Sequence, residues 1–337
     1  MARKSSFLFP TDFSAYAEYA MHYAFSAARR YGAEMHLVHV LDPDLLSHGP
    51  SLGLWVTDTD REKVLNSLRE HVQSRLDHLI QVAEEAGVRA VSHIAVGNPS
   101  VEICRSAQTL NCNIVLIGTH GRSGFDRYVY GSTCEKVVRM SSVPVLSIKN
   151  PIQKFVKEDL SSICVKRVLF PTDFSSFSQK ALPLAASFCQ EFGATLVLAH
   201  VWERAAYFPN FMPEMELRNS PKIMNEARES LEKIASEAGV SDLEIQVLRG
   251  IPHREIVQLA TDTDVDLVVM ATHGRSGMAL TIFGSVAEKV VRSAPCPVLT
   301  VRPTARLDAP QPTEPSARKK KAELALAAKL THTGHGA

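Results

Sequence analysis

The sequence contains the same pattern twice, and this repeat limits the chain to folds built from two similar units. Residues 119–124 and 272–277 both read THGRSG, at an offset of 153 residues. Nearer the start of each copy, residues 7–14 (FLFPTDFS) match residues 168–175 (VLFPTDFS) at an offset of 161. A repeat of this length indicates a duplicated domain. We therefore predict four segments: a first domain at 1–150, a linker at 151–165, a second domain at 166–303 and a tail at 304–337. The tail is poor in large apolar residues, so we expect it to be disordered apart from a short helix at 317–330.

Within each copy, short apolar runs alternate with stretches of helical periodicity. Residues 34–40 (EMHLVHV) and 113–117 (NIVLI) have the length of strands, whereas residues 60–86 carry apolar side chains on one helical face. Strands that alternate with helices favour a parallel sheet covered on both faces. Each copy is therefore expected to form an α/β domain, and the second copy is expected to repeat the order of elements in the first.

Two long segments are expected to be loops. They are residues 41–59, which contain Trp55, and residues 203–221, which contain three aromatic residues at 207–211 and three prolines. Long loops in compact domains are often functional. The aromatic residues either cover a ligand or pack on a neighbouring domain, and packing is the favoured interpretation.

A glycine-rich segment follows the fourth predicted strand of the first copy. Gly118, Gly121 and Gly131, the last followed by Ser132, have the spacing G-x2-G-x9-G-S. Glycine permits φ > 0 and close approach to a ligand, and a helix N-terminus attracts phosphate. Ser132 to Glu135 also reads as a capping box with Ser132 as the N-cap. The segment is therefore either a phosphate cradle or an ordinary capped helix start; it is not a Walker A loop.

The segment Pro-Thr-Asp-Phe-Ser follows the first predicted strand of each copy. In open α/β sheets, ligands bind beyond the carboxyl ends of the strands, and this segment lies there. Asp12 and Asp173 either accept hydrogen bonds from a base or ribose or cap the next helix. The sequence alone favours neither role.

Composition excludes several classes of protein. A net charge of +1 argues against a basic nucleic-acid-binding surface. The chain has no apolar run long enough to cross a bilayer, and Pro10 and Asp12 interrupt the apolar core that a signal peptide needs. Six cysteines without a C-x-x-C pair are typical of reduced thiols. We therefore expect a cytoplasmic protein that has neither nucleic-acid nor membrane partners.

The sequence shows no catalytic constellation. Neither copy has an evident nucleophile beside a base, and neither has metal-ligand spacing. His36 and His39 are three residues apart on a predicted strand and so point to opposite faces, which prevents a simple shared metal site. We therefore predict no catalytic residues, no metal ligands and no enzyme, although slow hydrolysis of a bound nucleotide stays open.

Taken together, these motifs resemble the universal stress protein family. The resemblance rests on the two Pro-Thr-Asp-Phe-Ser segments, the glycine spacings, the E-x-V-V-R helices and the P-V-L strand starts, and it covers residues 5–149 and 166–302. It implies two Rossmann-like (HUP-type) domains, each a five-stranded parallel sheet with helices on both faces. It also implies ATP binding, with any Mg²⁺ held mainly by the phosphates, and a regulatory role in the stress response. The alternative is a chaperone-like interaction scaffold with vestigial loops.

The resemblance also implies which residues contact the nucleotide. In the first copy these are Pro10, Thr11, Asp12, Val40, Gly118, Gly121, Arg122, Gly131, Ser132 and Thr133. In the second copy they are Pro171, Thr172, Asp173, Val201, Gly274, Arg275, Gly284, Ser285 and Val286. Ala271 stands where the first copy has Gly118. A methyl group weakens the second site if that position needs φ > 0 or close approach, so the first site is favoured.

The family resemblance further predicts how the two copies meet. Residues 143–149 and 296–302 would be the edge strands of their sheets, and exposed edges tend to be covered or paired. We expect them to pair with each other inside one chain. Association of two chains into a homodimer is compatible with this arrangement.

Overall fold

The computed structural model describes residues 5–43, 58–119, 131–149, 163–203, 213–274, 284–302 and 305, without the side chains of residues 58–62 and 213–220. The predictions for Trp55, for residues 207–211 and for the tail helix lie outside these ranges.

The first copy forms alternating strands and helices in the predicted order. The elements are β1 (Ser6–Pro10), α1 (Ala15–Tyr31), β2 (Glu34–Leu41), α3 (Asp58–Glu85), β3 (Ala90–Val96), α4 (Pro99–Thr109), β4 (Ile114–Gly118), α5 (Ser132–Met140) and β5 (Val145–Ile148). The strands pair in parallel in the order β3-β2-β1-β4-β5. This order reverses direction between β1 and β4, which places the switch point of the sheet beside the Pro-Thr-Asp-Phe-Ser segment.

The second copy repeats the strand order, and one of its helices differs from the first copy. The elements are β6 (Arg167–Pro171), α6 (Ser176–Gln179), α7 (Leu182–Phe192), β7 (Thr195–Trp202), α8 (Pro213–Ala238), β8 (Leu243–Arg249), α9 (Pro252–Asp262), β9 (Leu267–Ala271), α10 (Ser285–Ser293) and β10 (Val298–Val301). The counterpart of α1 is split into α6 and α7. Pro183 lies in the first turn of α7, and proline inside a continuous helix would lose a hydrogen bond and clash with the preceding turn.

The predicted loop at 203–221 is too long. Helix α8 begins at Pro213, so the predicted loop includes the first nine residues of this helix. Proline at the first position is compatible with a helix, since its missing N–H would have no partner there. Pro221 lies inside the helix.

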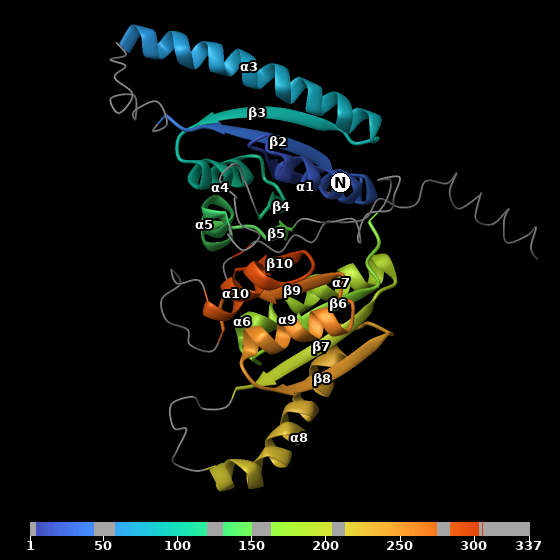
Figure 1. The fold of residues 1–337 in the computed structure, drawn as a ribbon. Coiled ribbons are helices and arrows are strands. Elements are labelled where there is room, and N and C mark those ends of the chain that lie inside the picture. Colours follow the sequence, from blue (N-terminus) through green and yellow to red (C-terminus); the bar gives the residue numbers. More distant parts are fainter. Residues whose placement is uncertain are drawn as a thin grey trace, which may run out of the picture.

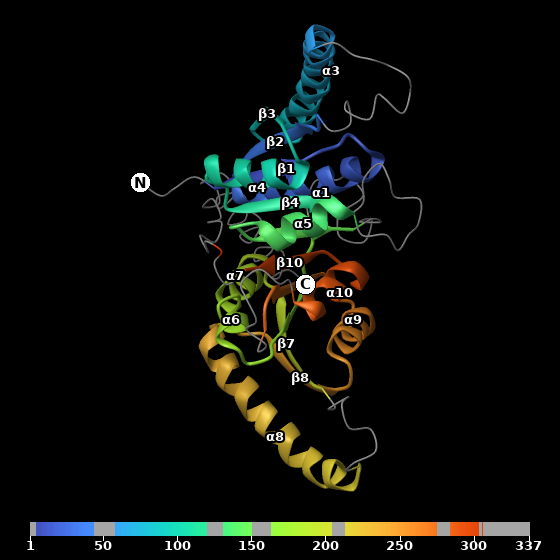
Figure 2. The same cartoon turned by 90° about the vertical axis from the view of Figure 1, so that its left-hand side faces the viewer.

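The two sheets join into one. The ten strands run in the order β3-β2-β1-β4-β5-β10-β9-β6-β7-β8, and β5 and β10 pair antiparallel at the centre. Figures 1 and 2 show the two halves one above the other, with α3 and α8 at opposite ends. The predicted fold class, a Rossmann-like α/β fold present twice, is confirmed. The buried apolar side chains of both halves form one continuous core.

Cations and aromatic rings from each half cross the junction. Arg30 at the end of α1 donates to the carboxylate of Glu191 on α7 (2.8 Å), and the ring of Tyr31 meets Phe188 edge-on (6.1 Å). After β5, Lys149 donates to the carbonyls of Arg292 and Ala294 at the C-terminal end of α10.

The same contact is made in the opposite direction after β10. Arg302 occupies the position in the second copy that Lys149 occupies in the first, and it donates to the carbonyl of Met140 at the end of α5 (3.0 Å). A cation near a helix C-terminus satisfies free carbonyls and the negative end of the dipole. Each half therefore caps a helix of the other half.

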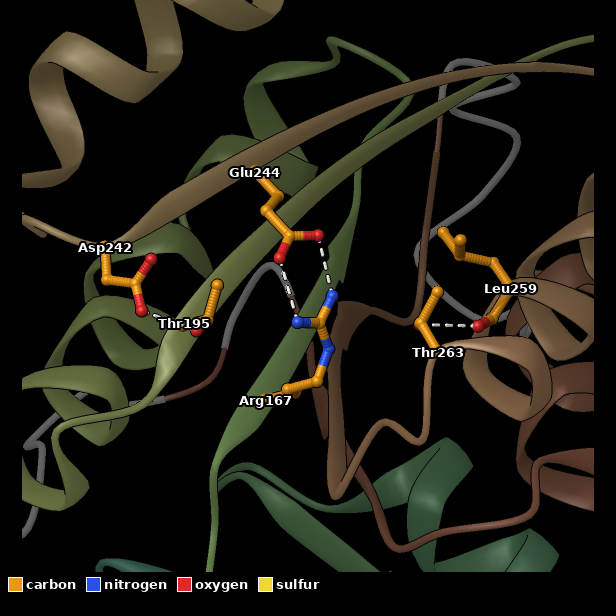
Figure 3. A network of polar contacts seen from close by, with 6 residues as sticks. All are labelled: Arg167, Thr195, Asp242, Glu244, Leu259 and Thr263. Atoms are coloured by element: carbon orange, nitrogen blue, oxygen red, sulfur yellow. Dashed lines mark hydrogen bonds and ion pairs between the residues drawn. The ribbon is translucent and has the colours of Figure 1, made fainter.

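A polar network holds the amino ends of the strands in the second half (Figure 3). Arg167, the first residue of β6, makes two hydrogen bonds to the carboxylate of Glu244 on β8 (2.8 and 2.6 Å), across β7. Thr195 at the start of β7 donates to Asp242 (2.6 Å). The carboxyl ends of the strands lie at the opposite ends of the same strands and take no part in these contacts.

Two histidines of the first half lie against each other on neighbouring strands. Nδ1 of His36 on β2 is 3.0 Å from Nε2 of His93 on β3. Burial lowers the pKa of both imidazoles, and for His36 the neighbouring His93 lowers it further. The folded state therefore resists protonation of this pair.

We expect His93→Gln to reduce the loss of stability on acidification. The unfolded chain takes up these protons near the ordinary histidine pKa of 6.5, whereas the folded chain does so at a lower pH. The stability that depends on the neutral pair is thus present above pH 6.5 and lost as the pH falls below it. Gln246 holds the matching position on β8, so glutamine suits this site. Melting temperatures between about pH 7.5 and about pH 5.5 should fall less steeply in the variant; equal slopes would contradict this.

Candidate functional site

The Pro-Thr-Asp-Phe-Ser segment adopts the same conformation in both copies. In the first copy, Oγ1 of Thr11 accepts from the N–H of Phe13 and Oδ1 of Asp12 accepts from the N–H of Ser14, both at 3.0 Å. The corresponding bonds of Thr172 and Asp173 in the second copy have the same length. Both copies form the same hydrogen bonds at the same lengths, which indicates that this loop must adopt one particular conformation.

The helix caps answer the question that the sequence left open for the two aspartates. Ser14 is the N-cap of α1 and accepts from the N–H of Ala17, and Ser175 is the N-cap of α6 and accepts from the N–H of Ser178. The aspartates are therefore not N-caps. Each uses one of its two carboxylate oxygens, Oδ1, to order the loop.

The second carboxylate oxygen of Asp173 faces the glycine loop. Oδ1 accepts hydrogen bonds from the N–H (3.0 Å) and the hydroxyl (2.6 Å) of Ser175. Oδ2 approaches Gly274 so closely that a Cβ on that glycine would lie 2.5 Å from it. The carboxylate and the glycine loop of the second copy are therefore adjacent, as a shared ligand site requires.

A strained phenylalanine ends the segment in each copy. Phe13 and Phe174 have φ angles of 59° and 65°, in the left-handed region that bulky residues rarely adopt. Phe13 stacks on His39 (4.7 Å between ring centroids), and Phe174 lies against His200 (4.3 Å). Such strain costs about 1–3 kcal/mol per residue and persists only where the surroundings fix it. Its presence in both copies makes the loop a candidate functional site.

The same two histidines hold the backbone of the loop. Nδ1 of His39 lies 2.8 Å from the carbonyl oxygen of Thr11, and Nδ1 of His200 lies 2.8 Å from that of Thr172. Since a carbonyl only accepts, Nδ1 carries the proton and donates. No motif in the sequence pointed to this role, because it depends on strands that are adjacent in space.

The capping box predicted at Ser132 is wrong. The N-cap of α5 is Gly131, which has no side chain to cap the helix, and Ser132 is the first helical residue. Glu135 forms an ion pair with Arg139 one turn later (2.8 Å) instead of reaching back to the helix start. Helix α10 begins in the same way, with Gly284 as its N-cap and Ser285 as its first residue. Both helices thus begin without a side-chain cap, which suits an anion.

The glycine N-caps are fixed by a backbone contact. The N–H of Gly131 donates to the carbonyl of Thr119 (2.7 Å), and the N–H of Gly284 donates to that of Thr272 (2.9 Å). A Cβ on Gly284 would lie 2.7 Å from the same carbonyl oxygen. Only glycine fits this close approach, which gives a physical reason for the last glycine in the G-x2-G-x9-G-S pattern.

Ala271 causes no backbone strain in the second copy. Gly118 is the last residue of β4 and pairs with Ile148, and Ala271 is the last residue of β9 and pairs with Val301. Neither is among the described residues with positive φ. The expectation that this glycine lets the backbone turn through φ > 0 is therefore wrong. A positive φ at this position is no longer a reason to favour the first site over the second.

The predicted residues of the second copy line one cavity of about 580 Å³. It lies at the carboxyl ends of β6, β7 and β9 and at the start of α10. The predicted residues in its wall are Pro171, Thr172, Asp173, Val201, Gly274, Gly284, Ser285 and Val286. Arg275 lies outside the described residues. The wall also contains His273 of the glycine segment, and residues that the sequence analysis missed: His200, Trp202, Glu203, Pro252, Ile256 and Met270.

The first copy places its predicted residues at the matching positions. Pro10 ends β1, Thr11 and Asp12 follow it, Val40 lies near the end of β2, and Gly118 ends β4. Gly131, Ser132 and Thr133 form the start of α5. Gly121 and Arg122 lie outside the described residues.

His273 gives the cavity wall a neutral imidazole. Its Nδ1 is 2.8 Å from the hydroxyl of Thr272, and its Nε2 is buried without a hydrogen-bond partner among the described residues. Burial, and then the charge of Arg302, lower its pKa. An unsatisfied buried nitrogen is costly, so a ligand that hydrogen-bonds to it would gain affinity.

The described residues show neither a metal centre nor a membrane span. No group of three or more potential metal ligands occurs among them. No helix in the described ranges has the length and apolarity needed to cross a bilayer. All six cysteines are described, and all are free thiols, four of them buried.

Comparison with known proteins gives consistent matches over both copies. A model of the universal stress protein family matches residues 5–149 and 165–302. A universal stress protein of Mycolicibacterium smegmatis is 26% identical over 314 residues, which cover 90% of this chain and 98% of that protein. One from Methanocaldococcus jannaschii is 29% identical over 157 residues, covering 42% of this chain and 97% of that protein. The crystal structure of a universal stress protein from Archaeoglobus fulgidus has a TM-score of 0.63 at 22% identity, covers 88% of this chain and 98% of its own, and shows the same fold.

We expect Gly284→Ala to destabilise the protein more than Gly274→Ala. The new methyl at 284 would meet a backbone carbonyl at 2.7 Å, which only a shift of the main chain can relieve. This should lower the free energy of unfolding by about 1–3 kcal/mol. At 274 the methyl would meet only the end of the Asp173 side chain, which can rotate, so the loss should stay below about 1 kcal/mol. Urea denaturation measures both, and the reverse order would contradict the assigned contacts.

Proposed function

The chain belongs to the universal stress protein family, and we propose that it binds ATP at the carboxyl ends of its parallel strands and acts as a regulatory module of the stress response. One observation carries the proposal. Eight residues from four separate stretches of the second copy, each expected to contact nucleotide, line one cavity of about 580 Å³. This volume is in the range of small-molecule and cofactor sites.

The two ends of the cavity suit the two ends of a nucleotide. The uncapped start of α10 and the close backbone at Gly274 and Gly284 provide N–H groups and a positive dipole for phosphates. The Asp173 carboxylate in the cavity wall would accept hydrogen bonds from ribose hydroxyls, and the end of β7 at Val201 would border the base. Mg²⁺, when it accompanies ATP, would be held mainly by the phosphates.

We propose a second, equivalent site in the first copy. The bonds that order Asp12 match those that order Asp173, and Gly131 begins α5 as Gly284 begins α10. The site would comprise the residues predicted there, including Gly121 and Arg122. In this proposal residues 1–150 and 166–303 are the two binding domains, and 151–165 is their linker.

The proposed role is binding rather than catalysis. Nucleotide occupancy would bias assembly or partner contacts through a difference in affinity between two states. A homodimer of the paired chain is one such assembly, and we assign neither a nucleic acid nor a membrane as partner. The six free thiols favour action in the reducing cytoplasm.

Replacing both Ser132 and Ser285 with proline should abolish the response to ATP without harming the fold. Each serine is the first residue of its helix, where proline is well tolerated. The preceding glycines have φ and ψ of −62° and 128° and of −63° and 129°, as a residue before proline requires. Each substitution removes one backbone N–H from the proposed phosphate site.

The measurement is the melting temperature with and without millimolar Mg-ATP. At about 100 times its dissociation constant, ATP should stabilise the wild type by about 2.7 kcal/mol for each occupied site. The proline variant should melt like the wild type alone and lose most of this shift. Ser132→Ala with Ser285→Ala, which keeps both N–H groups, should retain most of it. Nucleotide-free wild type that shows no shift would refute the proposal and favour an interaction scaffold.

A further inference from the structure

One difference between the two copies lies at the ends of β2 and β7. Leu41 and Trp202 are the last residues of β2 and β7, and their backbones are held alike. The carbonyl of Leu41 accepts from Gly97 (2.9 Å), and that of Trp202 accepts from Gly250 (3.1 Å). The backbone frame is therefore shared, and the side chain is what differs.

The registered neighbours on the next strand differ in the same way. Leu41 pairs with Val96 on β3, whereas Trp202 pairs with Arg249 on β8. The Arg249 guanidinium lies over the indole, 5.1 Å from its centroid. A cation over an indole face is attracted to it and restricts its orientation. An aliphatic pair in the first copy thus corresponds to an oriented aromatic ring in the second.

Trp202 ends β7, which β6 separates from β9, the strand that leads to the phosphate-binding helix α10. The half-buried indole forms part of the wall together with Pro252 and Ile256 of α9. In the first copy these two apolar positions are held by Pro99 and Ile103. Both copies therefore have an apolar surface for a base, and only the second adds a large π-face.

We propose that Trp202 makes the second site selective for purine nucleotides, through stacking of the base on the indole. This inference rests on the proposed nucleotide binding and deepens it. Bases stack on aromatic side chains with a strength that varies with the base, and a two-ring purine overlaps an indole more fully than a pyrimidine does. The first site, with Leu41, discriminates less between bases.

The indole itself provides the first test. Trp55 and Trp202 are the only tryptophans in the sequence, so in a full-length Trp55→Phe variant Trp202 alone reports by fluorescence. ATP should quench this signal, CTP should quench it only at higher concentration, and inorganic tripolyphosphate should leave it unchanged. Equal responses to ATP and CTP would overturn the inference.

The second test measures affinity at the second site alone. A Ser132→Pro background silences the first site, and calorimetry then compares Trp202→Leu with Trp202→Phe. Leucine, the residue of the first copy, should weaken ATP binding about 5- to 100-fold and remove the preference over CTP. Phenylalanine, which keeps a π-face, should retain most of both. Leu41→Ala is the matched control and should change neither.

The outcomes separate this inference from the proposed function. ATP binding that is lost in Ser285→Pro, yet is equally strong in the wild type and in Trp202→Leu, would overturn the role of the indole and leave the nucleotide site intact. Absence of any ATP binding in the nucleotide-free protein would overturn both. An equal loss of affinity in Trp202→Leu and Trp202→Phe would assign Trp202 a packing role instead.

Discussion

The antiparallel pairing of β5 with β10 is the contact on which the rest of the architecture depends. Each of these strands has four residues and would otherwise be an exposed edge of a five-stranded sheet, open to other chains. Each also neighbours a strand, β4 or β9, that runs directly into a glycine loop. The junction therefore fixes the two halves at the elements that lead into the sites, whereas β3 and β8 form the outer edges of the sheet.

The site loops show how the fold stabilises an unfavourable backbone. Phe13 and Phe174 both adopt left-handed φ. In each copy a histidine from the next strand packs on the phenylalanine ring and donates to the carbonyl of the threonine two residues earlier. In the second copy the result is an aspartate whose Oδ1 accepts two hydrogen bonds and whose Oδ2 lies beside the glycine loop. A loop ordered in this way lowers the entropic cost of binding, because its backbone shape is set before a ligand arrives.

Most of the fold could be predicted from the sequence, because a repeat and its apolar runs are local signals. The errors occur where one local signal has two physical meanings. Ser132 and Glu135 match a capping box, yet Gly131 takes the cap and Glu135 pairs with Arg139. Pro213 lies in a predicted loop, yet it is the first residue of α8. The residues expected in the second site did come together, whereas Trp202 could not be predicted, since its role depends on Arg249 on a neighbouring strand.

The reciprocal helix caps have a consequence for symmetry. In a two-fold dimer of identical chains, each contact between two positions occurs twice, so any change appears on both sides at once. Here the matched positions are Lys149 in one half and Arg302 in the other, and each caps the opposite helix with different geometry. Linking the copies in one chain removes the requirement of self-complementarity. One half can then change independently, and a single polypeptide always carries both versions in a ratio of one to one.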